Sequence, residues 1–195
     1  MVKMQNKIFI IEHLEGKLFN WCIWEYENIS KIVGKNKLWI TNIKSNSDKN
    51  RLVRIAKVFK ESIRDMNLHR VCVLDPEARK TLSYKDRKNF DFFIFGGILG
   101  DYPPKKRTKK EVTRFIKKAG ARNIGKEQMS TDNAVYSVSK ILNGKNIKRM
   151  KFISKINIKI NEFESVELPY RYNLVGKKPL ISRKVVDYLR KKKSF

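Results

Sequence analysis

The stretch FDFFIFGG, residues 90–97, is the strongest indication of the fold. It is short, almost wholly apolar and ends in two glycines, as expected of a strand buried on both faces. Similar apolar runs occur at residues 7–11, 38–43 and 70–75. Amphipathic helical patterns separate them, at residues 19–33 and 51–66. Buried strands that alternate with helices are typical of a parallel sheet covered on both faces, so the sequence predicts an α/β fold.

The rest of the chain carries further patterns of regular structure. They predict a short basic helix at residues 108–118, a short strand at 121–125 and a capped helix from Thr131 to about 142. A strand exposed on one side is expected at 151–163 and a basic C-terminal helix at 182–193. The chain has 195 residues, a length typical of one domain. We therefore expect a single domain over residues 1–195.

The charge of the chain is far from balanced. Lys and Arg number 45 against 19 Asp and Glu, a net charge of +26. The excess is clustered, because residues 105–122 hold nine bases and one acid and residues 176–195 hold eight bases and one acid. Residues 1–34 are neutral. Such clustering favours a basic face that contacts RNA or a ribonucleoprotein. The alternative is a solvated surface that reflects a compositional bias.

Several classes of protein are disfavoured by the sequence. The longest nearly apolar run, residues 92–99, has eight residues, whereas a membrane-spanning helix needs roughly 20. No secretory leader is evident, so we expect a cytoplasmic protein. Cys22 and Cys72 lie among apolar neighbours, so we expect them to be buried thiols. His13 and His69 lack the spacing of a metal site.

Two glycine-containing turns follow predicted strands. Gly96, Gly97 and Gly100 precede Asp101 and a Pro-Pro pair, which rules out a dinucleotide fingerprint because that motif runs directly into a helix. The glycines would let a ligand approach the backbone at the carboxyl end of the sheet, and we expect Gly97→Val to abolish ligand binding more than folding. The second turn, residues 122–135, is either a helix cap or part of the same ligand site.

Four stretches together resemble a known family. They are LDPEA at residues 74–78, FGGILGDYPPKKRT at 95–108, ARNIGKEQMSTDNAV at 121–135 and ESVELPYRY at 164–172. In this order they are similar to the predicted AdoMet-dependent RNA methyltransferases, a family of the SPOUT class. A fungal member of that family methylates an arginine of a small-subunit ribosomal protein. The resemblance implies an α/β fold with a trefoil knot and a mostly parallel sheet.

The resemblance also implies a cofactor and its site. S-adenosyl-L-methionine (AdoMet) would lie in the knot, held by the backbone of three loops and without a metal. The cofactor-binding residues would be Leu74, Gly96, Gly97, Ile98, Gly100, Asp101, Asn123, Ile124, Gly125, Met129, Thr131, Asp132 and Ala134. An arginine guanidinium needs carboxylates that orient it and accept its proton. We expect Asp101, Glu164 and Glu167 in that role, with Glu162 close by.

Three functions remain open at this point. The favoured one is methylation of an arginine of a small-subunit ribosomal protein. The first alternative is methylation of rRNA or tRNA, which the positive charge also suits. The second is a ribosome-binding or nucleic-acid-binding protein without catalysis. In each case the partner is the ribosome or RNA, contacted through residues 105–122 and 176–195, and we expect a monomer.

Overall fold

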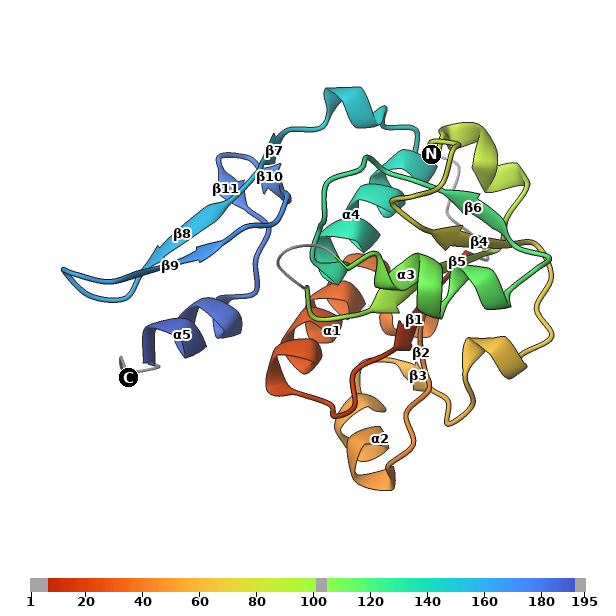
Figure 1. Cartoon of the computed structure of the whole chain (residues 1–195), viewed down its shortest axis with the longest axis horizontal. Coiled ribbons are helices and arrows are strands. Elements are labelled where there is room, and N and C mark those ends of the chain that lie inside the picture. The colour runs from red at the N-terminus through yellow and green to blue at the C-terminus, as the bar shows by residue number, and fades with distance from the viewer. Residues whose placement is uncertain (1–6, 101–104, 192–195) are drawn as a thin grey trace.

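A six-stranded parallel sheet forms the centre of the computed structural model, which describes residues 7–100 and 105–191 (Figure 1). The strand order is β3-β2-β1-β5-β4-β6, and every neighbouring pair is parallel. The strands are β1 (Ile8–His13), β2 (Leu38–Thr41), β3 (Lys57–Val58), β4 (Val71–Leu74), β5 (Phe92–Gly97) and β6 (Gly120–Arg122). The predicted α/β class and parallel sheet are therefore confirmed.

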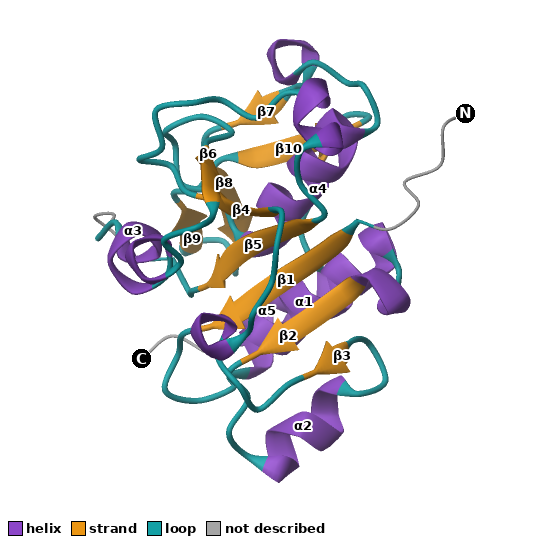
Figure 2. Cartoon of the chain, turned by 90° about the vertical axis from the view of Figure 1, so that its right-hand side faces the viewer, coloured by secondary structure: helices purple, strands orange, loops and turns teal. Residues whose placement is uncertain are grey.

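Each face of the sheet buries its own apolar cluster. Phe9 and Ile11 of β1 face one cluster, whereas Ile10 faces the other, because successive side chains of a strand point to opposite faces. Helices α1 (Asn20–Val33) and α4 (Thr131–Leu142) cover the first face. Turns that contain Ile63, Val112 and Ile116 pack over the second, and α3 (Arg107–Glu111) lies near the carboxyl end of β5 (Figure 2). Burial on both faces explains why the strands are almost continuously apolar.

The helix predicted over residues 51–66 is wrong. The chain instead forms α2 (Asn46–Leu52), which Ser45 caps, followed by strand β3 and a turn. The apolar residues of this segment do not share one face: Leu52 belongs to the cluster on the α1 side of the sheet and Ile63 to the cluster on the other side. Because β3 pairs with β2 at the edge of the sheet, the chain before β3 packs on one face of the sheet and the chain after it packs on the other.

Other predicted elements are confirmed with changed bounds. The basic helix over 108–118 shortens to α3 and a 3₁₀ turn, and the strand at 121–125 becomes β6, one residue earlier. The strand over 151–163 divides into β7 (Phe152–Ile153) and β8 (Ile156–Lys159). Helix α4 begins at Thr131 as predicted, and the basic C-terminal helix is α5 (Arg183–Lys191). Cys22 and Cys72 are buried free thiols, as expected.

The C-terminal region, residues 151–191, packs beside the sheet rather than within it (Figure 1). Strand β8 forms a hairpin with β9 (Ser165–Leu168), and β10 (Tyr172–Val175) pairs with β7 and β11 (Lys178–Pro179). The buried amides of Asn133 and Asn173 join this region to α4: the Asn173 backbone N–H donates to Asn133 Oδ1 at 2.7 Å. No described helix has the length and apolar character needed to cross a membrane.

Candidate active site

A cavity of about 240 Å³ opens at the carboxyl ends of β4 and β5. Loops that follow three strands and the start of α4 form its walls. This is the edge of a parallel sheet where ligands usually bind. The lining residues are Leu74, Asp75, Pro76, Glu77, Phe95, Gly96, Ile98, Lys105, Lys106, Arg107, Thr108, Ile124, Gly125, Lys126, Glu127, Gln128, Met129, Thr131 and Ala134. We call this space the first cavity.

Most of the residues expected to hold a cofactor line the first cavity. They are Leu74, Gly96, Ile98, Ile124, Gly125, Met129, Thr131 and Ala134. Asn123 lies behind the wall: its side chain accepts from the Gly125 N–H at 3.1 Å and donates to the Ala78 carbonyl at 2.8 Å. It therefore fixes the turn at Gly125, whose φ of 107° suits glycine. Asp101 lies outside the described residues.

Gly96 and Gly97 face opposite sides of β5. A Cβ at Gly97 would lie 2.5 Å from Tyr26 Oη and 2.8 Å from Ile11 Cγ2, both in the core. A Cβ at Gly96 would meet the flexible end of Ile98 at 2.9 Å, on the cavity wall. The structure therefore argues against the expectation that Gly97→Val would affect ligand binding more than folding, because the valine side chain would enter the core and not the ligand space.

Polar groups that the sequence analysis missed also line the first cavity. The carboxylate of Asp75 is buried and accepts from the Glu77 N–H at 2.9 Å and from Thr113 Oγ1 at 2.7 Å. Lys106 Nζ lies 3.0 Å from Glu77 Oε2, and this hydrogen bond lowers the pKa of Glu77. Asp75 directly follows strand β4 within the LDPEA stretch, so its position at a strand end was the signal available in the sequence.

A second cavity of about 420 Å³ adjoins the first. Ile98 and Met129 line both cavities and so form a shared wall. Helix α1, strand β9 and the segment between β9 and β10 close the other sides. The complete lining is Trp21, Glu25, Ile98, Leu99, Gly100, Met129, Ser130, Glu167, Leu168, Pro169, Tyr170 and Tyr172. Gly100, expected to hold the cofactor, lies here, where Tyr170 Oη donates to its carbonyl at 2.8 Å.

The two described acids that we expected to act in catalysis, Glu164 and Glu167, are not gathered at one place. Glu167 lines the second cavity, although its side chain is 48% exposed and lies 2.7 Å from Lys155 Nζ. Glu164 and Glu162 lie at the tip of the β8–β9 hairpin and line neither cavity. Glu164 accepts there from Asn161 Nδ2 at 3.1 Å.

Glu25 is an acid of the second cavity that the sequence analysis missed. It is only 8% exposed, and Trp21 Nε1 donates to its Oε1 at 2.8 Å. Burial raises its pKa to about 8, and the nearby Asp132 carboxylate adds to the shift. The signal in the sequence was an acid four residues after a tryptophan, on the apolar face of a helix.

Asp132, expected at the cofactor, is buried at the start of α4 and lines neither cavity. Its two oxygens accept from Asn28 Nδ2 at 2.7 Å, from Ser130 Oγ at 2.6 Å and from the Asn133 N–H at 2.8 Å. Burial raises its pKa as well. Because these donors stabilise its anion, the proton that the pair holds near neutral pH belongs on Glu25.

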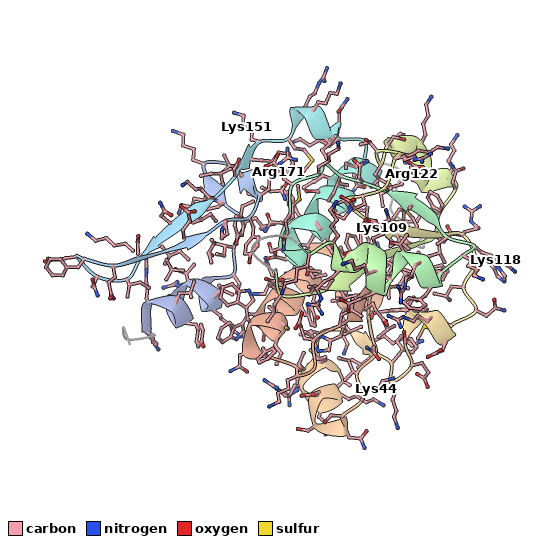
Figure 3. The ribbon with its side chains drawn as sticks, viewed as in Figure 1. Lys44, Lys109, Lys118, Arg122, Lys151 and Arg171 are labelled. Carbon is pink, nitrogen blue, oxygen red and sulfur yellow. The ribbon has the colours of Figure 1, made fainter. Side chains whose placement is uncertain are left out.

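The basic segment at residues 105–122 is only partly available to a partner. Arg107 lies 2.7 Å from Glu15 Oε1, and Arg122 lies 2.8 Å from the buried Asp86. Lys109 and Lys118 of this segment lie apart from each other and from Lys151 in one view of the molecule (Figure 3). Among the described residues, no cluster of His, Cys, Asp and Glu could hold a metal ion.

Comparison with known proteins places the chain among methyltransferases. Residues 8–194 match the family described as protein arginine N-methyltransferase SFM1-like. The chain is 34% identical over 200 residues to protein arginine N-methyltransferase SFM1 of Saccharomyces cerevisiae, with 94% of each protein covered. It is similar to the yeast SFM1 structure complexed with SAM at a TM-score of 0.88 and 32% identity, covering 96% of this chain and 91% of that chain.

More distant structures share only the fold. A dual-specific Trm10 from Thermococcus kodakaraensis aligns with a TM-score of 0.58 at 18% identity, over 72% of this chain and 95% of that chain. At this identity the likeness concerns the arrangement of the sheet and helices and not the substrate. The yeast SFM1 structure complexed with SAH, in contrast, covers 95% of both chains at a TM-score of 0.85 and 32% identity.

Proposed function

The chain belongs to the SFM1-like family of protein arginine N-methyltransferases, and we propose that it transfers a methyl group from AdoMet to an arginine side chain of a protein. Its fold is that of the SPOUT methyltransferases, as the resemblance implied. The trefoil knot stays a prediction. The observation that carries the proposal is the pair of adjoining cavities with a shared wall at Ile98 and Met129.

The first cavity has the chemistry that AdoMet requires. Leu74, Phe95 and Ile124 offer an apolar surface for an adenine ring. The carboxylates of Asp75 and Glu77 could accept hydrogen bonds from ribose hydroxyls, and Lys126 could meet the carboxylate of the methionine part. Gly96 adds a position where a Cβ would narrow the space. The residues present therefore fit the cofactor.

The adjoining cavities suit an in-line transfer. AdoMet, when bound, supplies a methyl group on a positively charged sulfur. The protein must align an attacking nitrogen with that methyl group and exclude water. A substrate side chain in the second cavity would approach the first across the wall at Ile98 and Met129. No ligand set for a metal is needed for this arrangement.

The finer proposal is that the substrate is a small-subunit ribosomal protein, which would place the reaction in the cytoplasm. The net charge of +26 and the basic segments favour a partner that contains RNA. A ribosomal protein beside rRNA would meet both the acids of the second cavity and the basic surface. Methylation of RNA itself is the second candidate, which the same charge supports. We propose that the enzyme acts as a monomer.

Labelled AdoMet and ribosomes from the same organism test the proposal. The protein is incubated with both, and the label is then separated into protein and RNA fractions. We expect the label in a single small-subunit protein, at an arginine, and its loss with Gly96→Val. Label in RNA alone would move the function to the second candidate. Absence of label in both fractions would favour a binding protein without catalysis.

A further inference from the structure

The buried carboxyl of Glu25 is placed to contact a ligand in the second cavity. It lies on α1 with only 8% of its surface exposed, and that surface lines the cavity. No ion pair to Glu25 occurs among the described residues, and no described lysine or arginine lines this cavity. Trp21 and Thr131 donate hydrogen bonds to this carboxyl, but no described cation balances a charge on it, so burial keeps it protonated near neutral pH. A cation that entered the cavity would stabilise its ionised form.

The remaining walls of the cavity suit a flat cation. Trp21, Tyr170 and Tyr172 bring aromatic rings to the same space as Glu25. A guanidinium is planar, stacks on aromatic faces and matches a carboxylate with two N–H groups. The shared wall at Met129 places this space next to the first cavity. An arginine side chain thus has both recognition elements within one cavity.

We propose that Glu25 receives the guanidinium of the substrate arginine and takes the proton from the nitrogen that is methylated. The inference rests on the proposed function and assigns a catalytic residue to it. Trp21 positions the carboxylate through its hydrogen bond to Oε1. Asp132, which lines neither cavity, acts through its charge on Glu25.

The proposed step balances in atoms and charge. As the N–C bond forms, the S–C bond breaks and its electron pair stays on sulfur, which becomes a neutral thioether. The methylated nitrogen loses one proton to the Glu25 carboxylate, and that proton later passes to water. The products are a methylated guanidinium, S-adenosylhomocysteine and one proton. No oxidant or metal takes part.

The protonation of Glu25 makes arginine binding depend on pH. The titratable groups that face it are Asp132 on α4, Cys22 and Tyr26 on α1, and Tyr172 on β10. Burial raises the pKa of Cys22 to about 12 and that of Tyr172 further, so both stay neutral. The pKa of Glu25 itself is about 8. A guanidinium must therefore displace a proton below pH 8, and its affinity should rise about tenfold per pH unit towards that value.

The indole N–H of Trp21 provides a readout that needs neither AdoMet nor turnover. Its NMR resonance, assigned with Trp21→Phe, is followed from pH 6 to 9.5 with and without n-butylguanidinium, and with n-butylurea as the neutral control. We expect a midpoint near pH 8 that n-butylguanidinium lowers and n-butylurea leaves unchanged. A resonance that does not respond to n-butylguanidinium would overturn the proposal, as would equal binding of this probe by Glu25→Gln.

Turnover on the protein substrate is the second measurement. Glu25→Gln should lower kcat by about 10² to 10⁴ with AdoMet affinity within about twofold, and Glu25→Asp should restore part of the rate. Glu27→Gln is the matched control, because Glu27 lies on the same helix but pairs with Lys184 at 2.6 Å. Full kcat in folded Glu25→Gln would overturn the assignment.

The two proposals fail differently. If the wild-type protein labels no protein substrate, the proposed function fails, while the indole titration still decides whether Glu25 binds a guanidinium. If the wild-type protein is active and Glu25→Gln equals it, only the role of Glu25 fails. Should Glu25→Gln not fold, Glu25→Asp and the wild-type titration carry the test.

Discussion

Two adjacent glycines of β5 should give opposite results when each is replaced by alanine. A Cβ at Gly97 would lie 2.5 Å from Tyr26 Oη, 2.8 Å from Ile11 Cγ2 and 3.0 Å from the Glu12 carbonyl oxygen. Tyr26 and Ile11 are fully packed core residues, and overpacking of this kind costs about 1–3 kcal/mol. For a chain of this length we expect Gly97→Ala to lower Tm by roughly 2–12 °C.

Gly96→Ala should leave Tm within about 2 °C of wild type, because its Cβ would meet the movable ends of Ile98 and Thr108 at 2.9 and 3.2 Å. That methyl group would enter the space proposed for AdoMet. A clash of about 1–3 kcal/mol corresponds to a Kd for AdoMet raised by roughly fivefold to 150-fold.

Thermal unfolding and calorimetric titration with AdoMet measure the two effects on the same samples. If Gly97→Ala melts like wild type, the core contact at Gly97 is refuted. If Gly96→Ala binds AdoMet like wild type, the first cavity is not the cofactor site.

Three further predictions concern the metal, a buried ion pair and the effect of pH on stability. AdoMet should bind equally well in excess EDTA, and calorimetric loss of binding there would contradict the metal-free site. Asp86→Ala should lower the free energy of unfolding by about 3–5 kcal/mol in urea titrations, because Arg122, 2.8 Å from Asp86, would lose its partner. A decrease no larger than that caused by substitution of an exposed surface residue would refute this. Glu25 holds a proton in the folded state up to about pH 8 but only up to about pH 4.5 when unfolded, so its contribution to stability falls as pH rises through that window. Urea titrations from pH 5 to 8 should therefore show a weaker decline for Glu25→Gln, and equal slopes would contradict the raised pKa.

The central sheet could be predicted because its strands are buried on both faces. A strand such as that at residues 90–97 can be predicted from its own sequence, since almost every side chain in it is apolar. The helix predicted at residues 51–66 was wrong because the apolar residues of this segment fit a helical period although the chain does not form one long helix. In the folded chain they serve two opposite faces of the sheet, and only the pairing of β3 with β2 determines this.

The site could be predicted where the backbone forms it and not where distant side chains meet. Gly96 lies at the carboxyl end of β5, and Ile124 and Gly125 lie in the loop after β6. Their place at the first cavity therefore followed from position along the chain. Glu25 comes from α1 and reaches a cavity whose other side is residues 167–172. Such a meeting depends on how the C-terminal region packs, which no local pattern reports.

The position of β1 in the sheet has a consequence for how the protein is made. Strand β1 precedes the other five strands of the sheet in the chain, yet it lies between β2 and β5, and Ile8 pairs with Phe92. A nascent chain that ends before residue 97 therefore leaves one edge of β1 without a complete partner. Contacts this far apart in sequence form slowly. The first half of the chain must stay unaggregated on the translating ribosome until β5 emerges and closes the sheet.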